Sequence, residues 1–236
     1  MTSTDHLSIF IEKLQKKEPF AVIRPADGEY LVMVDTHFTN CDNWTFNGGS
    51  LKDELIDIGK YNLQNFFVGI PCKACQGEYM FEYFKRTLNL NEKNTTYANI
   101  FCNKNWLPFT NFLIDTKLPL YYIGPGAEPS EKLNIVDRFL IDPYLVNNWD
   151  NQKESFKSEL TNWVKDKTGT FVFSAGPISK VMIPYLYQLF PTNQYLDVGS
   201  SLDLFMKGHS NRYYINTNDT CANIICDFDR GHIGHI

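Results

Sequence analysis

Short apolar runs alternate with amphipathic stretches along most of the chain. Each apolar run stops at a proline, a glycine or a polar cluster, which is typical of buried strands. The stretches between them place leucine, isoleucine and aromatic residues at helical spacing. This succession predicts an α/β fold, a mostly parallel sheet covered by helices. The predicted strands are 20–24, 66–71, 97–101, 118–126, 134–143, 169–177 and 193–200, and the predicted helices are 5–17, 49–63, 77–88, 105–117, 150–166 and 177–190.

The periodic pattern ends near residue 207. A chain of 236 residues fits one large domain or two small ones, and neither a repeat nor a low-complexity linker divides it. Hydrophobic residues make up 43% of the chain, which is ample for a core. We therefore expect a single domain over residues 1–206. Residues 207–236 are polar and irregular, which predicts a flap or a loose tail.

The charge balance limits the classes of partner. The formal net charge is −5 and the isoelectric point is about 5.5. A general nucleic-acid binder needs a basic surface, so we expect no nucleic-acid partner, although a basic pocket for one small anion is compatible with this balance. The first twenty residues resemble an amphipathic helix rather than a secretory signal, and no stretch is apolar enough to span a bilayer. We expect a soluble, cytoplasmic protein without a transmembrane segment.

The cysteines give a weak metal signal. One C-x-x-C pair occurs in "PCKAC", but a structural zinc site would need a second pair at matching spacing, and "CANIIC" is wider than usual. Plain buried or surface thiols are the favoured interpretation. In "GHIGHI", His232 and His235 would pair on a metal only if the end of the chain formed a helical turn, and a frayed tail is favoured instead. The six cysteines are Cys41, Cys72, Cys75, Cys102, Cys221 and Cys226.

The first candidate site is "RPADGE", directly after the first predicted strand. Pro25 restricts Arg24 to the extended region, so the strand should end at Arg24. Open α/β sheets bind ligands beyond the carboxyl ends of their strands. There Asp27 and Glu29 offer oxygen ligands for magnesium or manganese, and Arg24 a forked donor for phosphate. If the segment is extended the two carboxylates share a side; the alternative is a turn at Asp-Gly, or a helix capped by Asp27.

Two later segments add candidates for anion binding and proton transfer. In "FVFSAGPISK", Ser174 or Gly176 can cap a helix with Pro177 in its first turn, and its free N–H groups together with Lys180 suit an anion. The alternative is an ordinary strand-to-helix loop.

In "YLDVGSSLDLF", either Asp197 or Asp203 is a candidate base or sugar-hydroxyl contact. The alternative for Asp203 is a simple helix cap. The Gly-x-Gly pattern of methyltransferases is matched only weakly, because Ser201 replaces the second glycine and too few residues follow.

The order of these segments resembles the GT-D glycosyltransferase family, formerly a domain of unknown function. Its members carry an Arg-x-x-Asp-Gly-Glu element, matched here from Arg24 to Glu29. They also carry a late Gly-Pro-x-x-Lys helix start, matched from Gly176 to Lys180, and an Asp-hydrophobic-Gly strand end, matched from Asp197. The resemblance spans residues 18–205, with a loose match in the middle, and implies a Rossmann-like fold.

The resemblance implies roles for these residues. Asp27 and Glu29 become catalytic residues that serve a divalent metal, Mn²⁺ or Mg²⁺, and the donor diphosphate. The other implied contacts to the donor are Arg24, Gly28, Ser174, Gly176, Pro177, Lys180 and Asp197, with Arg212 as a further phosphate contact. Many members continue the last segment with a histidine and acidic residues, whereas serines and Leu202 intervene here, so Asp203 is the candidate acceptor-side base.

The resemblance implies a metal-dependent glycosyltransferase that moves a sugar from a nucleotide-diphosphate donor, a UDP-sugar, to a hydroxyl of a glycan or glycoconjugate. The chemistry suits the residues, because negative charge grows on the departing diphosphate and a carboxylate would take the acceptor proton. Two alternatives stay open. One is a metal-dependent phosphohydrolase of nucleotide sugars, and the other is a non-catalytic protein that binds a glycan or a nucleotide.

Overall fold

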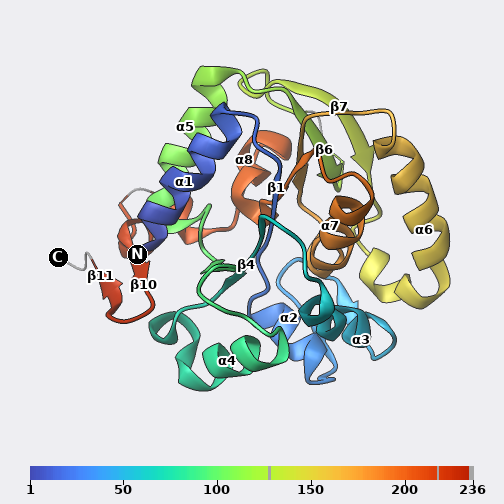
Figure 1. Ribbon diagram of the computed structural model, residues 1–236, viewed down its shortest axis with the longest axis horizontal. Helices are drawn as coiled ribbons and strands as arrows, with labels where there is room; N and C mark the ends of the chain where they lie inside the picture. Colours follow the sequence, from blue (N-terminus) through green and yellow to red (C-terminus); the bar gives the residue numbers. More distant parts are fainter. Residues whose placement is uncertain (127–128, 217, 234–236) are drawn as a thin grey trace.

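A central parallel sheet organises the protein. The computed structural model describes residues 1–126, 129–216 and 218–233. Seven strands pair in the order β5-β4-β1-β9-β8-β6-β7, and every pair is parallel. This confirms the predicted Rossmann-like α/β fold (Figure 1). The strands are β1 (Phe20–Ile23), β4 (Phe66–Ile70), β5 (Thr95–Tyr97), β6 (Leu120–Gly124), β7 (Ile135–Leu140), β8 (Thr170–Phe173) and β9 (Gln194–Asp197).

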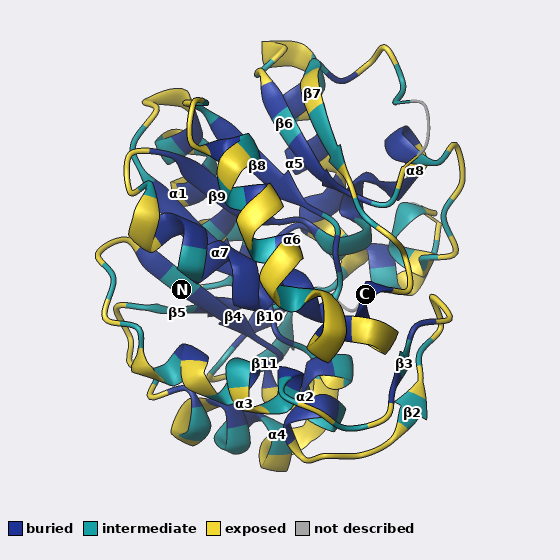
Figure 2. Ribbon diagram, turned by 90° about the vertical axis from the view of Figure 1, so that its right-hand side faces the viewer, coloured by how far each residue is buried: buried dark blue, intermediate teal, exposed yellow. Residues whose placement is uncertain are grey.

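Helices cover both faces of this sheet and form two hydrophobic cores. Side chains alternate between the faces along a strand, so Ala21 and Ile23 of β1 enter one core while Phe20 and Val22 enter the other. The first core packs against α2 (Asp27–Met33), α3 (Leu51–Ile56), α4 (Lys73–Thr87), α6 (Trp149–Val164) and α7 (Pro177–Leu189). The second packs against α1 (Ser3–Gln15), α5 (Trp106–Thr116) and α8 (Asp203–Met206). The inner strands are buried and the outer side of α6 is exposed (Figure 2).

One predicted strand is misplaced. The run 97–101 was expected to be extended, but β5 is Thr95–Tyr97 and the chain then turns, with the Ile100 N–H donating to the Tyr97 carbonyl at 3.0 Å. Ile100 and Phe101 are nevertheless buried, and Phe101 stacks on Phe109 of α5 with ring centroids 4.4 Å apart. An apolar run that fills the core from a loop has the same sequence pattern as a short strand.

Small elements lie outside the main sheet. A hairpin of β2 (Phe38–Thr39) and β3 (Thr45–Phe46) follows α2. A second hairpin, β10 (Ile225–Asp227) and β11 (Gly231–Ile233), lies in the irregular segment that follows α8. The described residues also include short 3-10 helices: η1 (Asp57–Lys60), η2 (Asn103–Asn105), η3 (Leu145–Asn148), η4 (Gly199–Leu202), η5 (Tyr213–Ile215) and η6 (Thr220–Asn223).

The described part of the irregular segment packs against the body of the protein. Thr2 forms a β-bridge with Asp227, and the Cys226 N–H donates to Ser3 Oγ at 3.1 Å. The Phe228 ring stacks on Tyr97 with centroids 4.0 Å apart. The segment therefore lies beside the first residues of the chain, as Figure 1 shows for β10 and the N-terminus. His235 lies outside the described residues.

The strand order creates a crevice between β1 and β9. These neighbouring strands end at the same edge, but β1 leads into α2 on one face and β9 leads into η4 and α8 on the other. Chains that leave adjacent strands in opposite directions leave a gap at the carboxyl edge, where open α/β sheets bind ligands. Within the described ranges, no helix is both long enough and apolar enough to cross a membrane.

Candidate functional site

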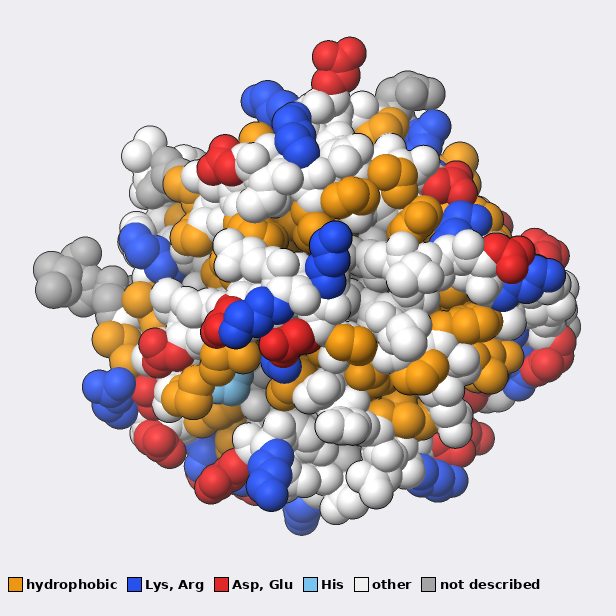
Figure 3. Space-filling view, turned by 45° about the horizontal axis from the view of Figure 1, so that its top comes forward, with side chains coloured by type: hydrophobic (Ala, Val, Ile, Leu, Met, Phe, Trp, Pro, Cys, Tyr) orange, Lys and Arg blue, Asp and Glu red, His pale blue; other side chains and the backbone are white. Residues whose placement is uncertain are grey.

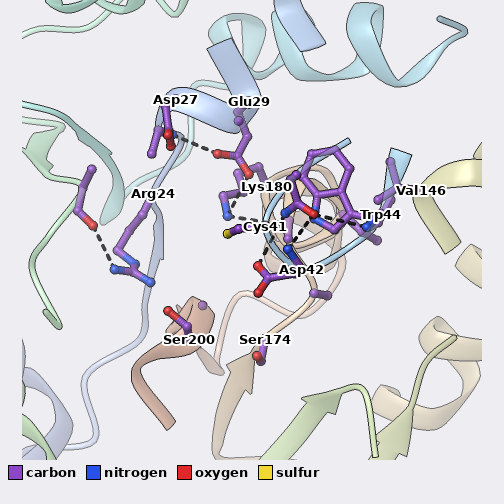
Figure 4. A pocket seen from close by; sticks show the side chains of 18 of the residues that line it. Arg24, Asp27, Glu29, Cys41, Asp42, Trp44, Val146, Ser174, Lys180 and Ser200 are labelled. Carbon is purple, nitrogen blue, oxygen red and sulfur yellow. Dashed lines mark hydrogen bonds and ion pairs between the residues drawn. The ribbon is translucent and has the colours of Figure 1, made fainter. Parts of the chain in front are cut away.

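A cavity of about 800 Å³ opens at this crevice. Its wall includes residues that follow β1, β8 and β9, together with the loop between β2 and β3 and part of the segment after α8. The volume lies within the usual range for small-molecule sites, roughly 300–1,000 Å³. Most of the side chains singled out from the sequence are gathered here (Figure 4).

Arg24 forms the floor between β1 and β9. Its backbone N–H donates to Asp197 Oδ2 at 2.9 Å, and its Nε donates to the Asp197 carbonyl. Its Nη1 donates to the Ala98 carbonyl at 2.8 Å and to Cys102 Sγ at 3.3 Å. The guanidinium is buried, yet Arg24 reaches the cavity wall. It is held in one orientation by the ends of two strands.

Gly199 allows this close approach. Its φ is +51°, in the region that favours glycine, and a Cβ built there would lie 2.6 Å from Arg24 Nη2. The sequence motif singled out the Asp-hydrophobic-Gly strand end, and the structure gives that glycine a steric role beside Arg24.

We expect Gly199→Ala to destabilise the protein more than Gly208→Ala does. Gly208 also has a positive φ, +75°, but nothing lies within 4 Å of a Cβ there, so this control carries only the backbone cost of about 1–2 kcal/mol. Gly199→Ala additionally displaces a buried, hydrogen-bonded guanidinium, which should add roughly 1.5–3 kcal/mol. Urea unfolding of both variants measures the difference. Equal losses of free energy would contradict the steric role.

Lys180 is the centre of a buried ion cluster. Its Nζ lies 2.9 Å from Asp197 Oδ2 and 3.2 Å from Glu29 Oε1, and donates to the Gly176 carbonyl at 3.1 Å. Burial lowers the pKa of Lys180, but the carboxylates of Asp197 and Glu29 outweigh burial and raise that pKa above its usual value of 10.5. Asp197 is fully buried and lies outside the cavity wall, where its carboxylate contacts the Arg24 N–H and Lys180 Nζ.

Asp27 and Glu29 do not form the side-by-side pair that an extended segment would give. They are the first and third residues of α2, and residues two apart on a helix point in different directions. Asp27 is exposed on the cavity wall. Glu29 is buried, and its Oε2 accepts from the Ala26 N–H at 2.9 Å, which holds the start of the helix.

A divalent cation therefore fits Asp27 better than Glu29. Both Glu29 oxygens are engaged, one by Lys180 Nζ and one by the Ala26 N–H. Asp27 has neither an ion pair nor a side-chain hydrogen bond to any residue in the described ranges. Magnesium is usually held by one or two carboxylates plus substrate phosphates, and Asp27 supplies one such carboxylate. Gly28 lines the same wall, 3.7 Å from the Trp44 ring measured from a Cβ built on it.

The start of α7 has less free capacity for anions than its sequence suggests. The Ile178 N–H donates to the Ala175 carbonyl and the Ser179 N–H to the Gly176 carbonyl, each at 3.2 Å. The Ala175 N–H donates to Ser179 Oγ at 3.1 Å. Ser174 and Gly176 line the cavity, whereas Pro177 is buried outside its wall. The helix start therefore shapes the cavity and holds Lys180 more than it offers donors.

Asp203 contributes a further carboxylate to the cavity wall. It is the first residue of α8, largely buried, and its Oδ1 lies 3.1 Å from Lys207 Nζ. Burial raises the pKa of Asp203 above its usual value of 3.8, and Lys207 offsets only part of that rise. A carboxyl group with a raised pKa beside a cavity suits proton transfer.

Arg212, which the sequence singled out, reaches the cavity. Its Nη2 donates to Asp42 Oδ2 at 2.8 Å and links the segment after α8 to the β2–β3 loop.

Sequence reasoning missed several other residues of the cavity wall. Trp44 from β2–β3 and Tyr214 from η5 add aromatic surface, and Tyr214 Oη lies 3.0 Å from Ser200 Oγ. No local motif marks these positions, since only the tertiary fold brings them to the strand ends.

Comparison of the chain with protein-family models gave no match. Comparisons with curated proteins and with solved structures gave none either.

Proposed function

We propose that the protein is a glycosyltransferase that uses a nucleotide-diphosphate sugar, a UDP-sugar by its resemblance to the GT-D family. The observation that carries this proposal is the cavity at the crevice between β1 and β9, whose wall includes the separate carboxylates of Asp27 and Asp203. Sugar transfer needs one negative centre for a cation on the donor side and one base on the acceptor side. The cavity is large enough for both substrates to meet.

Asp27 and the guanidinium groups serve the donor in this proposal. Asp27 would hold Mn²⁺ or Mg²⁺ together with the diphosphate, and the bound cation would neutralise charge on the leaving group. Arg24 presents a fixed guanidinium to the cavity, and Arg212, from near the other end of the chain, presents a second one. Guanidinium groups form paired hydrogen bonds with phosphate oxygens. Glu29 acts indirectly by keeping Lys180 in place.

Asp203 is the proposed base toward the acceptor hydroxyl. Its raised pKa increases its affinity for a proton while Lys207 keeps part of its charge stabilised. The cavity wall also favours transfer over metal-dependent phosphate hydrolysis. Hydrolases of that class gather several histidines and aspartates around the metal, and no histidine of the described residues lines this cavity.

We expect UDP with Mn²⁺ to raise the melting temperature of the wild-type protein. A ligand at about 100 times its Kd stabilises the folded state by about 2.7 kcal/mol, which is a rise of about 5–10 °C for a chain of this length. Asp27→Asn should lose the manganese-dependent part of the rise, because the amide removes the charge that holds the cation. A thermal-shift titration with UDP, GDP and ADP, each with and without Mn²⁺, measures this.

Asp53→Asn is the matched control. Asp53 is also an exposed aspartate in the first turn of a short helix, α3, and it lies outside the cavity wall. Its variant should keep the full response to UDP and Mn²⁺. A folded wild-type protein that responds to no nucleotide, or equal responses from both variants, would contradict the proposal.

A further inference from the structure

Three cysteines and one histidine meet beside the C-terminal hairpin. Cys72 Sγ lies 3.5 Å from Cys75 Sγ and 3.4 Å from Cys226 Sγ, and Cys75 and Cys226 are 3.4 Å apart. His232 Nε2 lies 3.1 Å from Cys75 Sγ. All four atoms fall within 4.8 Å of one another, and Cys72 and Cys226 are buried. They come from parts of the chain more than 150 residues apart.

Two of these groups come from the start of α4, and the other two come from the β10–β11 hairpin. Cys72 caps the start of α4, and the Cys75 N–H donates to the Cys72 carbonyl at 3.0 Å, so the C-x-x-C pair turns both sulfurs toward one point. Cys226 and His232 are direct partners across the β10–β11 hairpin. Residues directly opposite one another in an antiparallel pair share a face, so these two side chains also point the same way.

The distances match a four-ligand metal centre better than a disulfide. With Zn–S bonds of about 2.3 Å, the sulfurs of a tetrahedral site lie roughly 3.8 Å apart. The three S–S separations here are close to that value and nearly equal. A disulfide would bring one pair to about 2.0 Å and exclude the third sulfur. All three cysteines are free thiols.

We propose that Cys72, Cys75, Cys226 and His232 bind a zinc ion. Three thiolates and an imidazole nitrogen form a tetrahedral set that suits zinc and not magnesium or manganese, which prefer oxygen. On binding, the three thiols release their protons to solvent as the metal–sulfur bonds form. This site is distinct from the cation proposed at Asp27 and does not depend on the proposed function.

The surroundings support a structural role for this ion. Asn99 Nδ2 donates to Cys226 Sγ at 3.0 Å, a contact that would orient and stabilise a metal-bound thiolate. All four positions of the tetrahedron are filled by the protein, as in structural rather than catalytic zinc sites. The β10–β11 hairpin is only two strands wide, and such a hairpin is marginally stable alone. The ion would fasten it to the start of α4, where Cys75 also lines the cavity.

The test is the zinc content of the full chain, purified with a reducing agent and without chelators. Wild type should retain a stoichiometric amount of zinc by elemental mass spectrometry, and Cys226→Ser should lose most of it. Cys221→Ser is the matched control, because Cys221 lies in the same segment outside the cluster, and it should keep its zinc. His232→Ala should weaken retention, whereas His232→Cys, which restores a ligand, should recover it.

A second measurement covers variants that fail to fold. Cobalt added to metal-free wild type should give the intense visible absorption of tetrahedral, thiolate-bound Co²⁺, and zinc should displace it. Removal of zinc should also expose the hairpin, so trypsin should cleave after Arg230 faster than in the zinc-loaded protein. Wild type that holds no zinc and gives no tetrahedral cobalt spectrum overturns the proposal. So does equal zinc loss from Cys221→Ser and Cys226→Ser.

Discussion

Lys180→Met should lower the stability of the protein by about 3–5 kcal/mol, the usual cost of removing one partner of a buried ion pair. Methionine keeps much of the volume of the side chain but leaves Asp197 and Glu29 without their shared cation in the interior. For a chain of this length the loss corresponds to a fall in Tm of roughly 6–20 °C. Differential scanning calorimetry at neutral pH measures it.

Lys52→Met is the control for a surface ion pair. Lys52 Nζ lies 3.2 Å from Asp35 Oδ2, but both side chains are partly exposed, and such pairs contribute about 0–1 kcal/mol. A loss for Lys180→Met no larger than that of Lys52→Met would mean that the buried cluster is not a source of stability.

The pH dependence of the Lys180 contribution has a definite sign. Its pKa in the folded state is raised above 10.5, so the stabilisation is fully present below that value and is lost as the pH rises through the folded pKa. The difference in free energy of unfolding between wild type and Lys180→Met should therefore be constant near neutral pH and shrink above about pH 10.5.

Asp203→Asn should lower the rate of sugar transfer by about 10²–10⁴-fold, the usual contribution of a positioned acid or base. The same change should not lower stability at pH 7. The pKa of Asp203 is raised in the folded state by burial, so the free energy of unfolding falls as the pH rises from 3.8 through the raised pKa. Asparagine removes this loss, so the variant should be at least as stable as wild type. Release of UDP from a panel of UDP-sugars, and urea unfolding, measure the two effects.

Lys207→Met separates the role of Asp203 from simple structural damage. Lys207 lowers the pKa of Asp203 through their ion pair, so its removal should raise that pKa further. The acid limb of kcat/KM should then move to higher pH while the maximal rate above it changes little. An acid limb that does not move, or a fully active Asp203→Asn, would exclude Asp203 as the base.

The fold was largely predictable because its strands are buried on both sides. Strands such as β1 and β8 appear in the sequence as short, continuous apolar runs, which the alternation with amphipathic helices then assigns to a parallel sheet. The prediction of a strand at Ile100 and Phe101 was wrong because burial also explains an apolar run in a loop. Burial gives a loop the composition of a strand, and only the pairing of Thr95–Tyr97 with β4 distinguishes them.

The candidate site was predictable in position but not in detail. Arg24, Asp27 and Asp203 reach one cavity because the carboxyl ends of parallel strands meet at one edge. The direction of Glu29 depends on whether residues 27–33 are extended or helical, and the motif fits both. Its ion pair with Lys180 joins residues about 150 positions apart, which no local spacing encodes.

The sulfur cluster illustrates the same limit. The C-x-x-C pair of Cys72 and Cys75 was visible in the sequence, but its partners were not an evenly spaced second pair. Cys226 and His232 become neighbours only through the pairing of β10 with β11. The interpretation of plain thiols rested on spacing along the chain, and spacing does not reveal side chains that a hairpin brings together.

The order of the strands also bears on how the protein is made. The sheet has β1, β4 and β5 on one side and β8, β6 and β7 on the other, and β9 is the strand that joins them. Yet β9 is the last of the seven to leave the ribosome. Any sheet that forms before residues 194–197 are available would leave the edges of β1 and β8 unpaired. The edges of β1 and β8 are therefore the surfaces that a chaperone would need to shield during synthesis.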